Sequence, residues 1–495
     1  MDNIKKLKRR DFITTASLAF TGIAMSQSDI LAKNKANKRP NIILILTDDH
    51  GYADIELKNL HKDLKTPNVN YLMKNGAHCP EGYCTAPQCV PSRAGIIAGQ
   101  YQNKLNVEEN SAYKNDKKGK TGIEVPNFEM WNNTKKWPQY MQSAGYVTGM
   151  AGKWHLGENE TIKKAGFDYV YHKSGKGDAW ANMDLQGNRI EEGTHPTEEY
   201  HLDACSKACV SFIKKNYQKP FMYYLAYRAP HTPMDAPKKY LDRFPGKMPE
   251  RRRHALGMMS AMDDGVGEIL KTLRSKKIEE NTLIFYVGDN GAILSYLRDR
   301  PITDRGGWDG SYNTPLNGEK GMLTEGGIRT PWLAYWKGTI PANTTFKHPV
   351  ISLDVAATAV SLAGIKKPTS MDGVNLIPYL SGEKKGAPHE ALYWRWIGQT
   401  AIRMGEYKYL SYKRADKLME FLFDVVKDKE EKNNLIDQHP KIVASLKKEL
   451  NRWSQTLTPP GMHQVLSKRD RFYVQYMGVE PDPNAPQKKK RRKKK

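Results

Sequence analysis

The sequence Asn41-Ile-Ile-Leu-Ile-Leu-Thr47 is followed directly by Asp48-Asp49-His50-Gly51. Its first seven residues form a continuous apolar run rich in β-branched side chains, which is typical of a strand buried on both faces of a sheet. Polar residues stand where this strand ends. Because open α/β sheets bind ligands at the carboxyl ends of their strands, the stretch predicts a buried strand with a candidate site at its end.

The same unit recurs along the chain. Apolar segments at 146–150, 221–226 and 283–287 each lead into polar or glycine-rich residues. Helices are expected between them, for instance over 254–273, where apolar residues are spaced three and four apart. This alternation predicts an α/β fold with a large, doubly wound, mostly parallel or mixed sheet flanked by helices.

The pattern changes near residue 388. Short segments separated by turns predict a smaller antiparallel sheet, and a helix is expected after it over 441–457; the segments are 392–396, 399–404, 407–412 and 420–424. We therefore expect a main domain at 38–387 and a C-terminal α+β subdomain at 388–478. Residues 481–495 contain Pro, Asn, Gln and then only Lys and Arg, which is typical of a disordered basic tail.

Residues 1–32 are expected to be an export signal. Basic residues, Arg9 and Arg10 among them, precede an apolar run over 12–25 with a small-residue cleavage site near 24–26. Arg9-Arg10-Asp11-Phe12-Ile13 resembles a twin-arginine signal, and the alternative is an ordinary secretory signal with two chance arginines. We expect a protein of the periplasm or the extracellular space. No later apolar run approaches 20 residues, so no transmembrane segment is expected after signal removal.

The formal net charge is +24 and is distributed unevenly. The last eight residues are all basic, and the first eleven carry a net +3. The remaining residues, 12–487, carry about +13, which favours an anionic partner. The basic tail could also suit nucleic acid, but the export signal argues against such a partner.

The five cysteines do not form a zinc-binding pattern. Cys205 and Cys209 lie four apart in an expected helix and are interpreted as buried small residues. Cys79 and Cys84 could form a disulfide in an oxidising compartment, although nothing in the sequence requires one. Cys89 differs from these four because of its neighbours.

Cys89-Val90-Pro91-Ser92-Arg93 is the most specific motif of the chain. Other short motifs accompany it in order: Asp48-Asp49, Gly152-Lys153-Trp154-His155-Leu156-Gly157, Ala229-Pro230-His231-Thr232-Pro233, Gly288-Asp289-Asn290-Gly291, and Pro315-Leu316-Asn317-Gly318-Glu319-Lys320-Gly321 with Glu325-Gly326-Gly327-Ile328-Arg329 behind it. Over roughly residues 40–460 the chain resembles the type I, formylglycine-dependent sulfatases of the alkaline-phosphatase-like superfamily.

The resemblance implies hydrolysis of a sulfate ester by Cys89 after its conversion to formylglycine. The hydrated aldehyde would attack sulfur with one hydroxyl, and loss of the proton from the other would release sulfate. Conversion implies a formylglycine-generating enzyme as a partner during maturation. The family usually continues its signature with Leu-Thr-Gly-Arg, whereas this chain has Ile97-Ala98-Gly99-Gln100. We therefore expect less efficient conversion, or a need for a particular converting partner.

The resemblance also assigns the metal ligands. Asp48, Asp49, Asp289 and Asn290 offer hard oxygen atoms, which suit Ca²⁺ first and Mg²⁺ second and argue against zinc, and Cys89 would join them in its converted form. Taken singly, an Asp-Asp pair after a strand is often a helix cap, and Gly-Asp-Asn-Gly is often a turn.

The remaining motif residues are expected to be catalytic. Arg93, one helical turn beyond Cys89, would brace the nucleophile or a metal ligand. Lys153 and Lys320 would neutralise sulfate oxygens. His155 would take a proton from the nucleophile, and His231 would protonate the leaving alcohol. The structural alternatives are a core histidine at 155 and a turn residue at 231.

The substrate is expected to be a sulfated poly- or oligosaccharide. The basic body, the export signal and the loop aromatics Trp131, Trp180 and Trp308 favour this class. Among the candidate substrate contacts are Arg228, His195 and Trp308. The alternatives are a small organic sulfate, as in an arylsulfatase, a phosphoester or phosphonate as in other members of the superfamily, and a non-catalytic role in binding polyanions.

Overall fold

The computed structural model describes residues 39–108, 110, 129–294, 301–303, 307–414, 417–459 and 470–479. The expected export signal and basic tail lie outside these residues. From Pro40 onward the chain belongs to one compact unit, and the domain boundary expected near residue 388 falls inside it and stays a prediction. Among the described helices, none combines the length and the hydropathy needed to cross a membrane.

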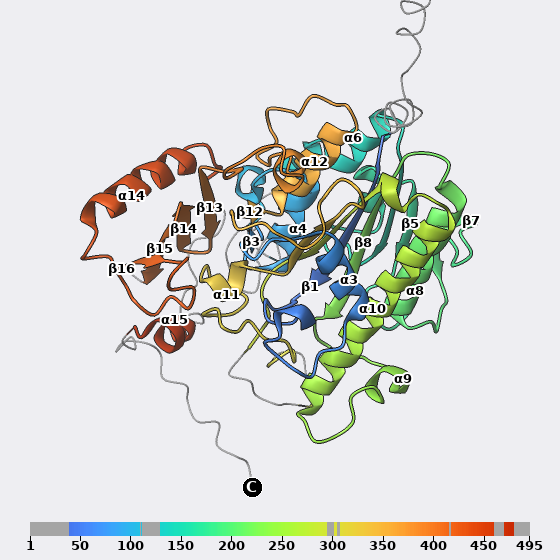
Figure 1. Ribbon diagram of the computed structural model, residues 1–495, viewed down its shortest axis with the longest axis horizontal. Coiled ribbons are helices and arrows are strands. Elements are labelled where there is room, and N and C mark those ends of the chain that lie inside the picture. Colours follow the sequence, from blue (N-terminus) through green and yellow to red (C-terminus); the bar gives the residue numbers. More distant parts are fainter. Residues whose placement is uncertain are drawn as a thin grey trace, which may run out of the picture. The chain divides into compact units, whose positions relative to one another are not determined.

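A ten-stranded mixed sheet forms the centre of this unit (Figure 1). Its strand order is β11-β2-β10-β9-β1-β8-β4-β5-β6-β7. The five strands from β9 to β5 run parallel, while β10 and β6 pair antiparallel with their neighbours. The predicted mixed sheet is confirmed. The bounds are β1 (Asn41–Asp48), β2 (Ala77–His78), β4 (Val147–Gly152), β5 (Tyr169–His172), β6 (Ala179–Met183), β7 (Arg189–His195), β8 (Phe221–Pro230), β9 (Thr282–Gly288), β10 (Trp332–Tyr335) and β11 (Thr344–Thr345).

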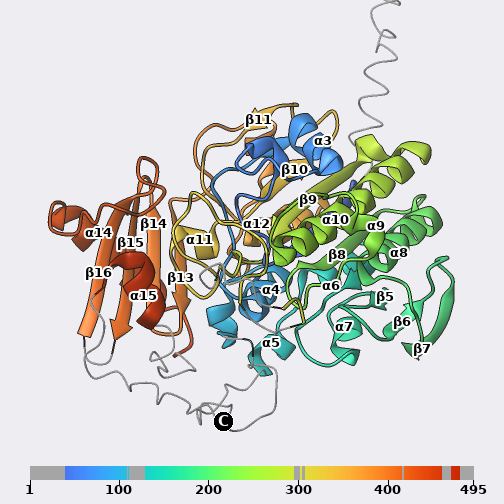
Figure 2. The ribbon, with the colours of Figure 1, turned by 90° about the horizontal axis from the view of Figure 1, so that it is seen from below.

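Helices cover both faces of the sheet (Figure 2). The even residues of β1, Ile42 to Leu46, pack with α4 (Cys89–Ala98), α6 (Trp137–Ser143) and α12 (Leu353–Leu362). Ile43 and Ile45 pack on the opposite face with α3 (Pro67–Asn75), α8 (His201–Asn216) and α10 (Glu250–Ser275). Burial on both faces is the reason that β1 is apolar at consecutive positions rather than at alternate ones.

Shorter elements complete the main part of the unit. They are η1 (Glu56–Lys58), β3 (Gly82–Tyr83), η2 (Gln102–Leu105), α5 (Glu129–Asn133), α7 (Glu160–Lys164), α9 (Lys238–Leu241), η3 (Glu279–Asn281), α11 (Glu325–Ile328), β12 (Val350–Ile351) and α13 (Ile377–Leu380). Strands β3 and β12 form a separate parallel pair. All five cysteines are buried and free, so Cys79 and Cys84 form no disulfide.

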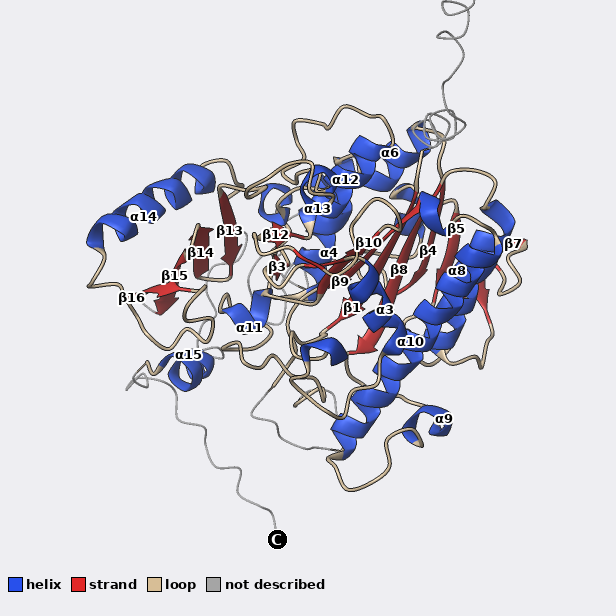
Figure 3. Cartoon of the chain, in the orientation of Figure 1, coloured by secondary structure: helices blue, strands red, loops and turns tan. Residues whose placement is uncertain are grey.

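The smaller antiparallel sheet is also confirmed (Figure 3). Its strands lie in chain order: β13 (Ala391–Trp396), β14 (Gln399–Met404), β15 (Tyr407–Arg414) and β16 (Lys417–Asp424). The helix expected over 441–457 is α14 (Pro440–Ser454). A further helix, α15 (Asp470–Met477), was not expected. The sheet shares a hydrophobic cluster with Tyr83, Met322 and Ile328, which belong to the preceding part of the chain.

Buried ion pairs join the small sheet to that preceding part. Lys408 on β15 places its Nζ 2.9 Å from Glu325 Oε1 and 3.0 Å from Glu431 Oε1, and all three side chains are fully buried. Burial raises the pKa of Glu431 to about 7. Burial opposes ionisation of Glu325 as well, but Lys408 and Arg329 lower the pKa of that carboxyl to about 2. One buried ammonium therefore serves two buried carboxyl groups.

We predict that Lys408→Met destabilises the protein by about 3–5 kcal/mol, because it leaves Glu325 and Glu431 buried without their shared cation. The free energy is read from the midpoint and slope of urea unfolding. The matched control is Lys432→Met, which removes an exposed partner of Glu430 and costs at most about 1 kcal/mol. Equal midpoints for the two variants would contradict the role given to Lys408.

Candidate active site

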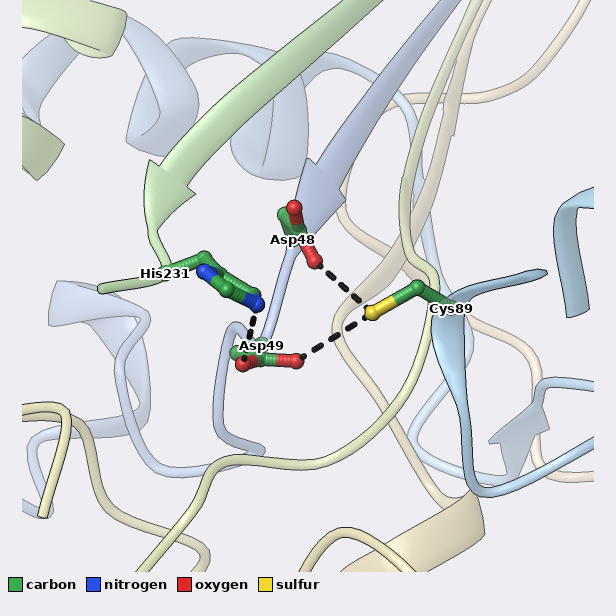
Figure 4. A group of neighbouring side chains, drawn as sticks. All are labelled: Asp48, Asp49, Cys89 and His231. Atoms are coloured by element: carbon green, nitrogen blue, oxygen red, sulfur yellow. Dashed lines mark hydrogen bonds and ion pairs between the residues drawn. The ribbon is translucent and has the colours of Figure 1, made fainter. Parts of the chain in front are cut away.

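Four polar side chains meet at the carboxyl end of β1 (Figure 4). Asp48 is the last residue of β1, and Asp49 follows it in the left-handed backbone region with a φ of 57°. Cys89 opens α4, and His231 follows β8. One potential ligand atom from each of the four lies within 4.8 Å of the others. The motifs that the sequence separates by nearly 200 residues thus form one site.

Cys89 is fully buried at the start of its helix. Its Sγ donates to Asp48 Oδ1 at 3.2 Å and to Asp49 Oδ1 at 3.8 Å. Burial, reinforced by the charge of Asp48, raises the pKa of the Cys89 thiol well above its usual value. The unmodified side chain is therefore a neutral thiol, which is a weak nucleophile.

Arg93 lies one turn further along α4, as the spacing predicted. Its Nε and Nη2 each lie 2.9 Å from Asp289 Oδ2. Its Nη1 donates to the Lys153 carbonyl at 3.0 Å and to the Tyr224 hydroxyl at 3.4 Å. The buried guanidinium therefore joins α4 to the ends of β9 and β4.

Two lysines bring positive charge to the cluster. Lys153 Nζ lies 2.5 Å from Asp48 Oδ2. Lys320 Nζ lies 2.5 Å from Asp49 Oδ1 and 3.0 Å from Cys89 Sγ. Burial alone would lower the pKa of Lys320, but Asp49 and the neighbouring acidic groups raise it well above its usual value. Lys320 therefore contacts the atom at which chemistry is expected, and Lys153 contacts the carboxyl group beside it.

The oxygen atoms of the cluster fit a divalent cation. Asp49 N donates to Asp289 Oδ1 at 3.2 Å, and Asn290 Nδ2 donates to Asp49 Oδ1 at 2.6 Å. Burial and the charge of Asp48 raise the pKa of Asp289 to about 7, so a further cation beside this carboxyl group would favour its ionised form. Asp49 Oδ2 and Asn290 Oδ1 are buried without a hydrogen-bond partner among the described residues. Hard oxygen donors of this kind suit Ca²⁺ or Mg²⁺.

The two histidines differ in their position. His231 Nε2 lies 3.6 Å from Asp49 Oδ2, and a quarter of the side chain is exposed. Burial, with help from Lys153 and Lys320, lowers the pKa of His231 to about 4. His155 has a φ of 64°, and burial followed by the charges of Lys153 and Arg93 lowers its pKa to about 2. Both imidazoles are neutral near pH 7 in this structure.

Of the expected substrate contacts, Arg228 links two loops through its guanidinium group and so serves as a brace between them. It is nearly buried, and its guanidinium donates to the carbonyls of Ser174 and Pro233, each at 3.0 Å. It thereby joins the loop after β5 to the loop that carries His231. A β-carbon on Gly175 would lie 2.5 Å from Arg228 Nη1, so a larger residue there would displace the guanidinium.

The structure corrects the expectation for Trp308, whereas that for His195 stays a prediction. Trp308 is 2% exposed and donates its indole N–H to Ser311 O at 2.7 Å, so it offers no face to a sugar; Trp131 and Trp180 are also buried. His195 ends β7, which lies four strands beyond β8 in the sheet. At the usual strand spacing this is about 19 Å from β8, so a role for His195 in contacting a more distant sugar of the substrate stays a prediction.

Two residues of the site carry no sequence signal. Tyr224 contacts Arg93 from within β8, where it looks like any other core aromatic. Asn110 Oδ1 accepts from Val90 N at 3.1 Å and so caps the helix that begins with Cys89. Neither residue belongs to a motif, and only the tertiary structure brings them to the site.

Comparisons with known proteins agree with this geometry. The model of the sulfatase family matches residues 40–365. A second model, described as the C-terminal region of N-sulphoglucosamine sulphohydrolase, matches residues 318–456. N-acetylgalactosamine-6-sulfatase of Mus musculus is 29% identical over 410 residues, which cover 78% of this chain and 74% of that protein.

Two further likenesses extend the comparison. An arylsulfatase of Hemicentrotus pulcherrimus is 27% identical over 401 residues, covering 75% of this chain and 67% of that protein. The crystal structure of Ps i-CgsB in complex with k-i-k-neocarrahexaose superposes with a TM-score of 0.72 and 29% identity, covering 89% of this chain and 98% of that one. The chain belongs to the sulfatase family, and it is a sulfuric ester hydrolase.

Proposed function

We propose that the protein removes sulfate from a sulfated poly- or oligosaccharide, using Cys89 in its formylglycine form and a bound divalent cation. The observation that carries this proposal is the position of Cys89 Sγ, held 3.2 Å from Asp48 Oδ1 and 3.0 Å from Lys320 Nζ. A nucleophile at this position is in contact with both the oxygen ligands and a cation that can bind sulfate. The neutral, buried thiol supports the need for conversion.

The formylglycine, once hydrated, would supply a hydroxyl nucleophile and a route for the release of sulfate. The cation would neutralise negative charge on oxygen. Ca²⁺ is proposed first because all four ligands from the chain, apart from residue 89, are carboxylate or amide oxygens. Asp48, Asp49, Asp289 and Asn290 would hold the ion. Arg93 keeps Asp289 in place through its two 2.9 Å contacts.

The chain's own residues would then bind the sulfate group and move protons. Lys153, which pairs with Asp48, and Lys320, which contacts Cys89, would bind the sulfate oxygens. His155 is neutral and would accept a proton from the nucleophile. His231 Nε2 lies beside Asp49 and is partly open to solvent, so we assign it the proton transfer to the leaving alcohol. A bound anion between the lysines would raise the low pKa of His231 and so favour the protonated form.

A carbohydrate substrate is supported by the relatives and by charge. N-acetylgalactosamine-6-sulfatase is named for a sugar substrate, and Ps i-CgsB has been crystallised with an oligosaccharide. Residues 12–487 carry about +13, which would attract a polyanionic chain. The likeness to an arylsulfatase keeps small organic sulfates as the second candidate.

We further propose that the protein acts after export. The arginine pair at residues 9 and 10 favours the twin-arginine route, which carries folded proteins. A formylglycine-generating enzyme would therefore act on Cys89 in the cytoplasm, before the protein reaches the periplasm or the extracellular space.

We predict that Cys89→Ala and Cys89→Ser both abolish hydrolysis of 4-nitrophenyl sulfate while leaving thermal unfolding unchanged. Wild-type protein produced without a converting enzyme is expected to be equally inactive. Mass spectrometry of the peptide containing Cys89 reports the conversion, because aldehyde and thiol differ in mass. Substantial turnover by Cys89→Ala would disprove the proposed nucleophile.

We predict that Asp48→Asn and Asp289→Asn each lower kcat/KM by about 100-fold or more and weaken Ca²⁺ binding measured by calorimetry, because each removes a charge from the ligand set. Chelation should inactivate the wild type, and Ca²⁺ should restore it better than Zn²⁺. Asp242→Asn is the control, since that exposed carboxylate pairs only with Lys238 among the described contacts. One equivalent of zinc and no calcium in the purified enzyme would contradict the oxygen-ligand assignment.

We predict that kcat/KM for a sulfated oligosaccharide falls more steeply with added salt than kcat/KM for 4-nitrophenyl sulfate. The Debye length shrinks from about 30 Å at 0.01 M salt to about 3 Å at 1 M, which suppresses long-range attraction of a polyanion. A small monoanion depends mainly on contacts with Lys153, Lys320 and the ion. The series is repeated after deletion of residues 486–495, which should leave aryl-sulfate turnover unchanged. Equal slopes for the two substrates would place a small organic sulfate first.

A further inference from the structure

Lys320 is held by a loop rather than by a helix or strand. Residues 313–324 lie between β9 and α11, and Lys320 stands in the second half of this loop. Its backbone N–H donates to Ala292 O at 3.0 Å, and Gly321 N donates to Pro87 O at 2.9 Å. The Nζ that contacts both Asp49 and Cys89 depends on how firmly this loop backbone is fixed.

Gln399 fixes the loop from the small sheet. It is the first residue of β14, and its side chain is fully buried. Its Oε1 accepts from Leu323 N at 3.0 Å, and its Nε2 donates to Gly321 O at 3.2 Å. Both partners are backbone groups within three residues of Lys320. A buried amide that satisfies two loop groups at once restricts the loop to one position.

Helix α15 supports the same loop from a second layer. The Tyr473 hydroxyl donates to Gln399 Oε1 at 2.5 Å, and the Tyr473 ring stacks on Tyr412 with 3.9 Å between centroids. Further along α15, the Tyr476 hydroxyl donates to Glu319 Oε1 at 3.3 Å. Asn317 Nδ2 donates to Tyr476 O at 3.1 Å. The loop is therefore fixed by hydrogen bonds on both sides of Lys320.

The orientation of the Gln399 amide follows from these contacts. Leu323 N–H can only donate, and Gly321 C=O can only accept, so exchanging Oε1 with Nε2 would break both bonds. The Tyr473 hydroxyl donates to the same Oε1 and so adds a further hydrogen bond to this amide. An apolar side chain at this position would remove both hydrogen bonds to the loop backbone.

We propose that Gln399 is a positioning residue for Lys320, with Tyr473 fixing its amide, so that the small C-terminal sheet contributes to sulfate binding through the loop that carries Lys320. This inference rests on the role given to Lys320 in the proposed function. Gln399 does not touch the reacting atoms. It acts by holding the backbone from which the Lys320 ammonium reaches Asp49 Oδ1 and Cys89 Sγ.

The test compares Gln399→Leu and Tyr473→Phe with the control Thr400→Val. Thr400 neighbours Gln399 on β14, but its hydroxyl pairs with Ser411 within the small sheet. We expect kcat/KM for 4-nitrophenyl sulfate to fall about 10- to 100-fold in Gln399→Leu, as for a misplaced catalytic group. Tyr473→Phe keeps the ring stack and should lose about 2- to 10-fold, as for one hydrogen bond. Thr400→Val should retain wild-type kcat/KM.

A double-mutant cycle separates positioning from general stability. The dissociation constant of inorganic sulfate is measured by calorimetry in the converted, Ca²⁺-loaded enzyme, with and without Lys320→Ala. We expect Gln399→Leu to weaken sulfate binding about 10-fold when Lys320 is present and less than about 2-fold when it is absent. An equal loss in both backgrounds, or no loss in either, would overturn the inference. If Gln399→Leu does not fold, Tyr473→Phe carries the same cycle with the criterion scaled to its smaller effect.

The variant Lys320→Ala by itself tests the proposed function separately from the positioning inference. If this variant binds sulfate and turns over substrate like the wild type, the proposed role of Lys320 fails, whatever Gln399 does. If Lys320→Ala is impaired but shows no coupling to Gln399 or Tyr473, the proposed function stands and the positioning inference fails.

Discussion

The structure depends on the burial of three carboxyl groups at one edge of a sheet. Asp48, Asp49 and Asp289 are fully buried. They lie close together, and the Asp49 backbone N–H donates to Asp289 Oδ1. Removing an ion from water costs several kcal/mol even after relaxation, so the group persists only with opposite charge beside it. Arg93, Lys153 and Lys320 provide part of that charge, and each comes from a different element. The fold must therefore bring helix, strand and loop to the same point.

Parallel strand order is what makes this convergence possible. Strands β9, β1, β8 and β4 are neighbours, and each ends at the same edge with residues of the site. Asp289 follows β9, His231 follows β8, and Lys153 follows β4. For this reason much of the site could be predicted from the sequence: each functional residue follows an apolar run, and parallel runs end together. Most of the strands expected from those runs lie within two residues of their observed bounds.

What the sequence could not predict depends on long-range contacts. Strand β7 is mostly exposed and has no apolar alternation. Helix α15 lies just before residues 481–495, which the sequence predicts to be a disordered tail. Trp308 was a candidate substrate contact because it is an aromatic residue in a loop, yet its indole N–H donates to Ser311 O and its ring packs on Tyr312. Gln399 is one of many polar residues in short strands. Its importance follows from the two backbone groups that it pairs, nearly 80 residues earlier in the chain.

The same balance of charge bears on the choice of nucleophile. A cysteine at the start of a helix and 3.0 Å from a lysine would ordinarily be an activated thiolate. Here Lys320 is already paired with Asp49, and Asp48 lies 3.2 Å from the sulfur, so a further negative charge is disfavoured. Burial, and after it the charge of Asp48, raises the pKa of Cys89. A site that holds its nucleophile among carboxylates suits a neutral hydroxyl better than a thiolate, because the hydroxyl need lose its proton only as the reaction proceeds. The charges around Cys89 are thus compatible with the conversion that we propose for it.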